Sequence, residues 1–198
     1  MSMDTAKRRW PLVEAAEVAE EIRNQLAHYC EVDRLIVAGS IRRRKQEVGD
    51  VEIVYVSRVG VGTPPGEMFP QSECLLADMR IEQLVGAGVL EKRTGEKGGA
   101  SWGEKNKLAV HRASGMPVDL FRTDEACFWN YLVCRTGPKE SNMAIANAAR
   151  DRGYKWRPYA SGFESLNEPG RVVRMNSERE VFEFVGLSYK DPEWRSEA

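Results

Sequence analysis

Two kinds of hydrophobic pattern alternate along the chain, one typical of helices and one typical of strands. Over residues 12–29, apolar side chains recur every three or four positions, which predicts an amphipathic packing helix. Residues 34–38 and 51–56 are short runs rich in branched side chains and bounded by turn residues, as expected of strands. Residues 108–111 and 118–122 are joined by a short glycine-containing turn, which predicts a hairpin.

Glycine and proline divide the rest of the chain, and from residue 125 the pattern becomes helical. The predicted segments are a loop at 60–70, a helix at 73–85, a glycine-rich turn at 97–107, a second loop at 162–170 and a terminal helix at 178–185. This order predicts an α+β fold with two parts. Residues 1–125 would form a mixed β-sheet with flanking helices, and residues 126–198 a small, mostly helical subdomain with a short strand or two.

The composition is that of an ordinary globular protein, with 42% hydrophobic and 30% charged residues. No apolar run reaches the length of a membrane-spanning helix or of a signal-peptide core, so we expect a cytoplasmic protein with no membrane partner. The four cysteines form no Cys-x-x-Cys pair, which argues against structural zinc and predicts reduced thiols. The formal net charge of −1 provides little attraction for phosphates, so any binding to nucleic acid would be loose and would weaken as salt rises.

The residues that carry chemistry lie around the second predicted strand. Gly39 and Ser40 offer backbone N–H groups and a hydroxyl to phosphate oxygens, and Arg43 can neutralise such oxygens with two parallel hydrogen bonds. Asp50 and Glu52 begin the strand, and strand alternation directs both carboxylates to the same face. Two such acids repel unless a cation lies between them, and magnesium prefers hard oxygen ligands.

Several motifs resemble those of the family X DNA polymerases, the DNA polymerase beta group. The spacing from Gly39 to Asp50, the Arg42-Arg43 pair and Gly49 before the first acid resemble the palm signature of that family. Four further segments resemble, in order, its nucleotide-selecting C-terminal subdomain: 136–142, 149–154, 177–182 and 186–195. The resemblance extends from about residue 16 to residue 195, with an unmatched middle.

The resemblance implies a nucleotidyltransferase palm followed by a thumb-like subdomain, and a minimal DNA polymerase that adds deoxynucleotides to a 3′-hydroxyl, with gap-filling repair as one use. Asp50, Glu52 and Asp119 would be the catalytic residues and the ligands of two magnesium ions, with manganese as a substitute. The implied nucleotide-binding residues are Gly39, Ser40, Arg43, Gly49, Thr136, Gly137 and Asn142. Arg42, Arg44 and Lys45 either contact substrate or form an exposed basic loop. An ion pair between Arg42 and Glu178 is also implied.

Three positions depart from the pattern of the family. Glu52 stands where the family usually has Asp, so the metal ions could be placed differently. Cys134 and Arg135 replace an aromatic or bulky pair before Thr-Gly, and selection against the sugar 2′-hydroxyl therefore cannot be inherited. Ala146 replaces an arginine that checks the templating pair, which predicts low fidelity.

The expected partners are a nucleoside triphosphate and a DNA primer–template or gapped DNA, with RNA as another acceptor, and the protein is expected to be a monomer. Candidate nucleic-acid contacts are basic residues near aromatic ones, with a solvated surface as the alternative: Lys105, Lys107, Arg150, Arg152 and Lys155. Few residues precede the matched region, so we expect no lyase domain and no helix-hairpin-helix clamp.

Two other functions remain open at this point. A template-independent nucleotidyltransferase acting on RNA or a small acceptor is favoured by the Cys134-Arg135 pair and the weak charge. An inactive nucleic-acid-binding module is disfavoured because all three acids are present.

Overall fold

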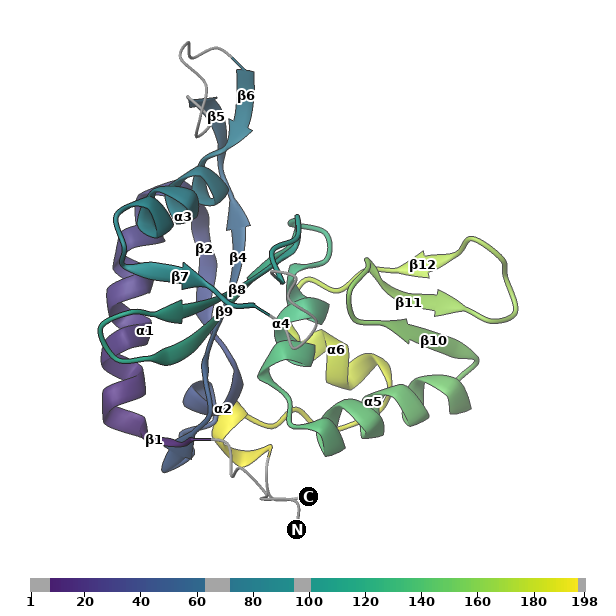
Figure 1. The fold of residues 1–198 in the computed structure, drawn as a ribbon. Helices are drawn as coiled ribbons and strands as arrows, with labels where there is room; N and C mark the ends of the chain where they lie inside the picture. Colours follow the sequence, from purple (N-terminus) through teal and green to yellow (C-terminus); the bar gives the residue numbers. More distant parts are fainter. Residues whose placement is uncertain (1–7, 63–71, 95–100, 196–198) are drawn as a thin grey trace.

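The computed structural model describes residues 8–62, 72–94 and 101–195. Its central element is a five-stranded sheet with the order β2-β4-β9-β8-β7 (Figure 1). The strands are β2 (Cys30–Val37), β4 (Val51–Ser57), β9 (Met116–Arg122), β8 (Asn106–His111) and β7 (Leu90–Lys92). Strands β4 and β9 are parallel and the other neighbours are antiparallel, so the sheet is mixed and the predicted α+β class is confirmed.

Two helices cover one face of this sheet, α1 (Leu12–Leu26) and α3 (Leu76–Gly86) (Figure 1). The buried residues of α1 recur with helical spacing: Ala15, Val18, Ala19, Ile22 and Leu26. They pack against the side chains of β4 that alternate toward the same core, among them Ile53 and Tyr55. The predicted helix over residues 12–29 is thus present, although its last turn is a 3-10 helix, η1 (Ala27–Tyr29).

The opposite face of the sheet packs against α4 (Phe128–Thr136). A second apolar cluster there joins Val54 and Phe121 of the sheet with Phe128 and Leu132 of α4. A short helix, α2 (Gly39–Arg42), contacts β4, α1 and α4. Strand β1 (Trp10–Pro11), next to α1, pairs with β3 (Glu47–Val48). The two sides of the predicted boundary after residue 125 therefore share a core, and the boundary itself stays a prediction.

The C-terminal part contains more strand than the sequence predicted. Its elements after α4 are α5 (Lys139–Asp151), β10 (Tyr154–Arg157), β11 (Gly162–Ser165), β12 (Val172–Val173), α6 (Glu178–Phe184) and η2 (Pro192–Trp194). The three strands form an antiparallel sheet, so the predicted loop at 162–170 is wrong at its beginning. Phe163 explains the difference. It is fully buried and stacks on Trp156 of β10, and this contact favours a strand although the segment begins with a glycine.

A two-stranded ribbon, β5 (Val59–Gly62) and β6 (Ser72–Leu75), extends away from the sheet (Figure 1). The predicted loop is therefore wrong for residues 60–62, and the predicted helix begins at Leu76 instead of residue 73. Gly60 misled the prediction: a Cβ there would lie 2.9 Å from Leu76 Cδ1, so the glycine serves close packing within a strand. Residues 63–70 of the predicted loop and 97–100 of the predicted turn lie outside the described residues.

The described helices include none that is both long enough and apolar enough to cross a membrane.

Candidate active site

The acidic residues predicted to be catalytic come from two neighbouring strands. Glu52 of β4 and Asp119 of β9 are directly opposite each other in the parallel pairing. Neighbouring strands lie about 4.8 Å apart and paired residues share a face, so these two side chains stand beside one another. Asp50 precedes β4 by one residue and, being two positions from Glu52, is directed to the same face.

A glycine is required at residue 39, beside Glu52 and Asp119. It opens α2 with a φ of 60°, and a Cβ at residue 39 would overlap the Oε2 atom of Glu52. The predicted Gly-Ser turn is thus the first turn of a short helix that begins at the carboxylates. Both Gly39 and Gly49 are buried, whereas Ser40 is partly accessible.

The charges of the three acids are incompletely balanced. Burial raises the pKa of Glu52 to about 7, and the neighbouring Asp50 and Asp119 carboxylates contribute in the same direction. The guanidinium groups of Arg135 and Arg43 act in the opposite direction. An additional positive charge at this place would therefore be favourable.

Arg93 provides a counter-charge that the sequence did not indicate. Its Nη2 atom lies 3.0 Å from Asp119 Oδ1, although the residue directly follows β7 at the far edge of the sheet. Within the described residues, no group of three or more His, Cys, Asp and Glu side chains is arranged to hold a metal ion. The residue types suit magnesium, since all are hard oxygen donors, but Asp119 is engaged by an arginine.

Arg135 lies against an aromatic wall next to Glu52. Its Cζ atom is 3.6 Å from the ring centroid of Phe121, and the rings of Tyr159 and Tyr131 are at 5.1 and 5.4 Å. The sequence marked Arg135 only as a departure from the family. The structure shows that it is a cation held by three rings and acting on Glu52.

A polar cleft of about 700 Å³ lies at α2 and the segment that follows it. Its lining residues are Arg9, Ser40, Arg43, Arg44, Lys45, Gln46 and Glu47, and we call it the basic cleft. Arg44 and Lys45, left undecided by the sequence, thus line the cleft with Ser40 and Arg43. Arg9 was missed; pairing of Trp10 with Val48 brings it to the cleft, and the run of basic residues before Trp10 was its only signal.

A second pocket of about 530 Å³ shares Arg43 with the basic cleft. Its walls come from the C-terminal part and are mostly apolar or aromatic, and we call it the apolar pocket: Cys134, Gly137, Pro138, Lys139, Asn142, Met143, Ala146, Trp156, Pro158 and Tyr159. Of the predicted nucleotide-binding residues, Gly137 and Asn142 therefore line this pocket. Asn142 Nδ2 donates to the Cys134 carbonyl oxygen at 2.8 Å, which holds its side chain.

Thr136 connects the two parts of the chain through arginines. Its hydroxyl accepts from Arg42 Nη1 at 2.8 Å and its carbonyl oxygen accepts from Arg43 Nη1. Because Thr136 is fully buried, it acts here by placing these arginines. Burial lowers the pKa of Arg43, which remains a cation.

The predicted ion pair between Arg42 and Glu178 is confirmed. The two residues form two hydrogen bonds, at 2.8 and 2.6 Å. Glu178 also accepts from Arg195 at 3.2 Å, and Arg195 is almost completely buried. Helix α2, which begins at the carboxylates, is thereby joined to α6 and to the end of the described chain.

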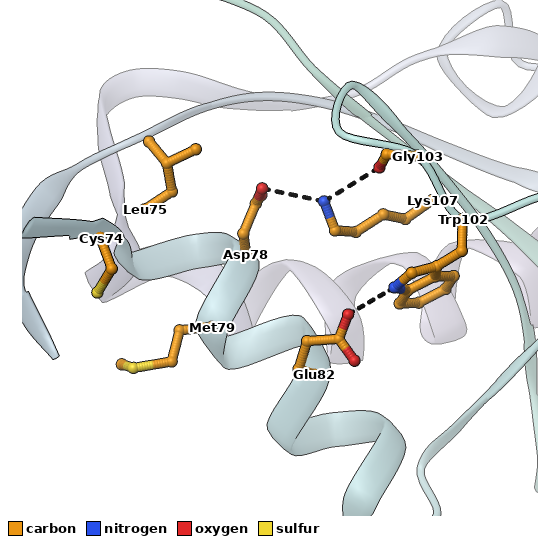
Figure 2. Close-up of a pocket in the computed structure, with 8 residues that line it drawn as sticks. All are labelled: Cys74, Leu75, Asp78, Met79, Glu82, Trp102, Gly103 and Lys107. Atoms are coloured by element: carbon orange, nitrogen blue, oxygen red, sulfur yellow. Dashed lines mark hydrogen bonds and ion pairs between the residues drawn. The ribbon is translucent and has the colours of Figure 1, made fainter. Parts of the chain in front are cut away.

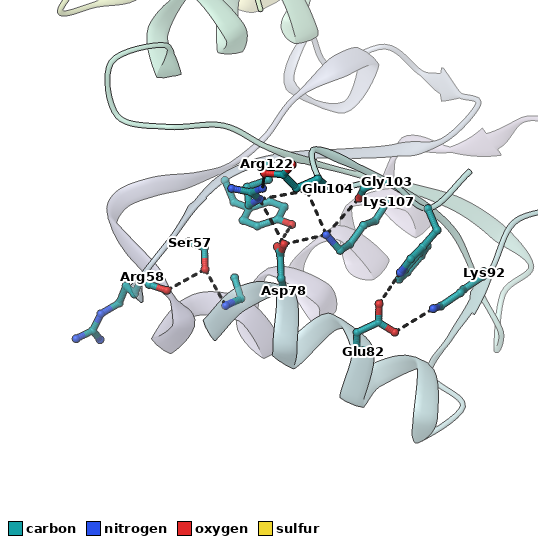
Figure 3. A network of polar contacts seen from close by, with 12 residues as sticks. Ser57, Arg58, Asp78, Glu82, Lys92, Gly103, Glu104, Lys107 and Arg122 are labelled. Carbon is teal, nitrogen blue, oxygen red and sulfur yellow. Dashed lines mark hydrogen bonds and ion pairs between the residues drawn. The ribbon is translucent and has the colours of Figure 1, made fainter. Parts of the chain in front are cut away.

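One predicted nucleic-acid contact is corrected by the structure. Lys107 is 5% exposed, and its ammonium group donates to Asp78 Oδ2 at 2.9 Å in the wall of a pocket of about 370 Å³ (Figure 2). Asp78 also accepts from Tyr55 and pairs with Arg122, so Lys107 belongs to a polar network between α3 and the sheet (Figure 3). The lysine points into the protein because alternate residues of β8 face the core.

The other candidates for nucleic-acid contact have accessible side chains. Lys105, Arg150 and Lys155 are exposed. Arg152 is exposed as well, but its Nη1 atom donates to the Phe184 carbonyl oxygen at 3.1 Å, which ties it to the end of α6.

Comparison with known proteins agrees with this architecture. The family model described as the DNA polymerase beta thumb matches residues 131–196. Over 187 residues, 94% of its length, the chain is 26% identical to the DNA polymerase/3′-5′ exonuclease PolX of Bacillus subtilis (strain 168). The chain spans 28% of the length of that relative. The thumb match and the similarity along nearly the whole chain confirm its resemblance to the family X DNA polymerases.

Proposed function

We propose that this chain is a nucleotidyltransferase that transfers a deoxynucleoside monophosphate from a nucleoside triphosphate to the 3′-hydroxyl of a DNA acceptor, with gapped DNA as the preferred one. The observation that carries the proposal is the pairing of Glu52 with Asp119 on adjacent parallel strands. Gly39, the first residue of α2, packs directly against Glu52, and the next residue of this helix, Ser40, lines the basic cleft. This combination suits phosphoryl transfer, because catalysis of that reaction consists mainly of positioning and charge stabilisation.

The two cavities suit the two ends of a nucleotide. In the basic cleft, Ser40 and Arg43 would bind the triphosphate oxygens, with Arg9 as a further cation. In the apolar pocket, aromatic and aliphatic walls would hold the base. Arg43 lines both cavities and is fixed on Thr136, so it would orient the phosphates relative to the base.

Asp50, Glu52 and Asp119 would hold magnesium, because their carboxylates share one face of the sheet and offer the hard oxygen atoms that this ion prefers. Bound magnesium would supply Lewis acidity toward the hydroxyl and neutralise phosphate charge. The carboxylates themselves would orient the 3′-hydroxyl of the acceptor. Asp119 must exchange its contact with Arg93 for this role.

Extension of a labelled primer by one nucleotide, in the presence of magnesium, tests the proposal. We expect Asp50→Asn and Asp119→Asn to abolish extension, whereas Glu52→Asp retains it, because the shorter acid still presents two oxygens. A matched control is Asp33→Asn, an exposed residue with a φ of 59°, which asparagine adopts equally well. Full extension by either Asn variant of the catalytic residues would refute the assignment.

A second candidate, template-independent addition, is supported by the apolar pocket. Met143 and Tyr159 line it and are each 53% exposed, and Ala146 provides no long side chain that could contact a template. An unpaired base could stack there. Extension of a single-stranded primer as fast as that of a templated primer would favour this candidate, whereas extension that follows the template favours the first.

A further inference from the structure

Four residues lie in one row across the central sheet, on the face that packs against α4. Arg93 N donates to the Leu108 carbonyl oxygen at 2.9 Å, which continues the pairing of β7 with β8 by one residue. Leu108 is the partner of Asp119, and Asp119 is the partner of Glu52. Paired residues of neighbouring strands point to the same side, so Arg93 and Asp119 are separated by one strand only.

The side chain of Arg93 spans that strand. Its guanidinium reaches Asp119 Oδ1 at 3.0 Å, and the side chains are 31% and 14% exposed. The ion pair is thus partly shielded from solvent, in contrast to the neighbouring pair of Arg112 and Glu91, whose side chains are 60% and 66% exposed at 3.6 Å. A partly shielded pair beside two more acids is a stronger interaction than a surface pair.

Resting on the function proposed above, we propose that Arg93 is a built-in counter-cation of Asp119. Before a dication binds, its guanidinium neutralises Asp119 and allows three acids to share one face. Binding of a dication at Asp119 displaces this guanidinium. Arg93 therefore competes with the dication and lowers the affinity of the free protein for it.

Competition and a purely supporting role predict opposite changes in dication affinity when Arg93 is removed. If Arg93 only held Asp119 in a ligating position, its removal would weaken dication binding. If it is a competing cation, its removal strengthens binding, because the dication then replaces no favourable contact and meets more uncompensated negative charge.

The test is a titration with Mn²⁺, followed by electron paramagnetic resonance of the free ion, on the whole chain without nucleotide or DNA. Mn²⁺ has the same preference for carboxylate oxygens as magnesium. We expect Arg93→Gln to bind Mn²⁺ about three- to tenfold more tightly than the unmodified chain. Arg93→Lys retains the charge and should remain close to the unmodified chain.

Arg112→Gln is the matched control, because it removes the same charge from a neighbouring, more exposed pair. It should change Mn²⁺ affinity by less than about twofold. Thermal unfolding gives a second measurement. Without metal, Arg93→Gln should have a lower Tm than the unmodified chain, and Mn²⁺ should raise its Tm by a larger amount.

The outcomes separate the inference from the proposed function. Mn²⁺ binding that requires Asp119 but is unchanged or weakened in Arg93→Gln would overturn the inference alone. Absence of Asp119-dependent Mn²⁺ binding in every variant would overturn both. Tighter binding by Arg93→Gln, unchanged in Arg112→Gln, supports Arg93 as the counter-cation.

Discussion

Glu52 is the residue whose charge state depends most on its surroundings in the site. Its pKa is raised from its ordinary value of 4.5 to about 7, first by burial and then by Asp50. A raised pKa in the folded state means that folding favours the protonated carboxyl. In the metal-free protein, the free energy of unfolding contributed by this group therefore decreases as pH rises from about 4.5 to about 7 and is constant above that range.

We therefore expect Glu52→Gln, which stays neutral, to have a higher Tm than the unmodified chain at pH 8 in the presence of EDTA. At pH 4.5 the two should differ much less, since Glu52 is then mostly protonated in the folded protein. Thermal unfolding at a series of pH values measures this difference. A constant difference between pH 4.5 and pH 8 would contradict the assigned cause.

Gly39 provides a second prediction at this scale. Gly39→Ala places a Cβ against the Glu52 carboxylate and should reduce nucleotide incorporation at least tenfold, because α2 must move away from β4. Gly115→Ala is the matched control: its φ of 72° imposes similar backbone strain, but no atom lies within 4 Å of the added Cβ. Equal losses of activity in both variants would show that strain alone, and not the contact with Glu52, is responsible.

At the scale of elements, the connection of α2 with α6 depends on Glu178. This carboxylate accepts hydrogen bonds from Arg42 and from Arg195. The side chain of Glu178 is only 7% exposed. Removing its charge leaves two guanidinium groups facing each other away from bulk solvent. Breaking such a pair from one side is strongly destabilising.

Glu178→Gln should lower the free energy of unfolding by about 3 kcal/mol. Glu183→Gln, on the same helix, removes a carboxylate from an exposed pair with Arg179 and should cost less than about 0.5 kcal/mol. Urea denaturation of both variants measures the contrast. Similar costs for the two would mean that the connection between α2 and α6 contributes little.

For the whole molecule, the near-neutral charge predicts weak DNA binding, because affinity for DNA comes largely from neutralisation of its phosphates. The formal net charge is −1. Of the four exposed candidate contacts, Arg152 is bonded to the Phe184 carbonyl oxygen, which leaves Lys105, Arg150 and Lys155. Each phosphate neutralised contributes about −0.9 to the slope of log K against log salt for duplex DNA, so these three residues give a slope of about −3 at most.

Fluorescence anisotropy at several KCl concentrations measures this slope. Lys155→Gln should make it shallower by about one if Lys155 binds a phosphate. Lys107→Gln should leave the slope unchanged, because Lys107 is buried on Asp78, while lowering stability. A slope that changes with Lys107 instead would contradict the position described for this lysine.

Several features of the fold could be predicted because they depend on local pattern. The apolar stripe of α1 and the alternation in β4 each follow from residues close in sequence. The ribbon of β5 and β6 and the strand β11 were missed, because their glycines indicate turns unless the packing partner is known. Leu76 packs against Gly60 of β5, and Trp156 packs against Phe163 of β11. Both partners lie outside the strand that they stabilise.

The sequence by itself indicated candidate residues for chemistry and determined, through strand alternation, that Asp50 and Glu52 share a face. The resemblance implied that Asp119 joins them, but only the tertiary structure showed that it lies on the adjacent strand, in register with Glu52. Only the structure, too, brought Arg93 across Leu108 to Asp119 and Arg9 to the basic cleft. The physical reason is that a strand's face is set by its own alternation, whereas its neighbours are set by sheet order and register. The order β4-β9-β8-β7 joins residues far apart in the chain, and no local pattern encodes it.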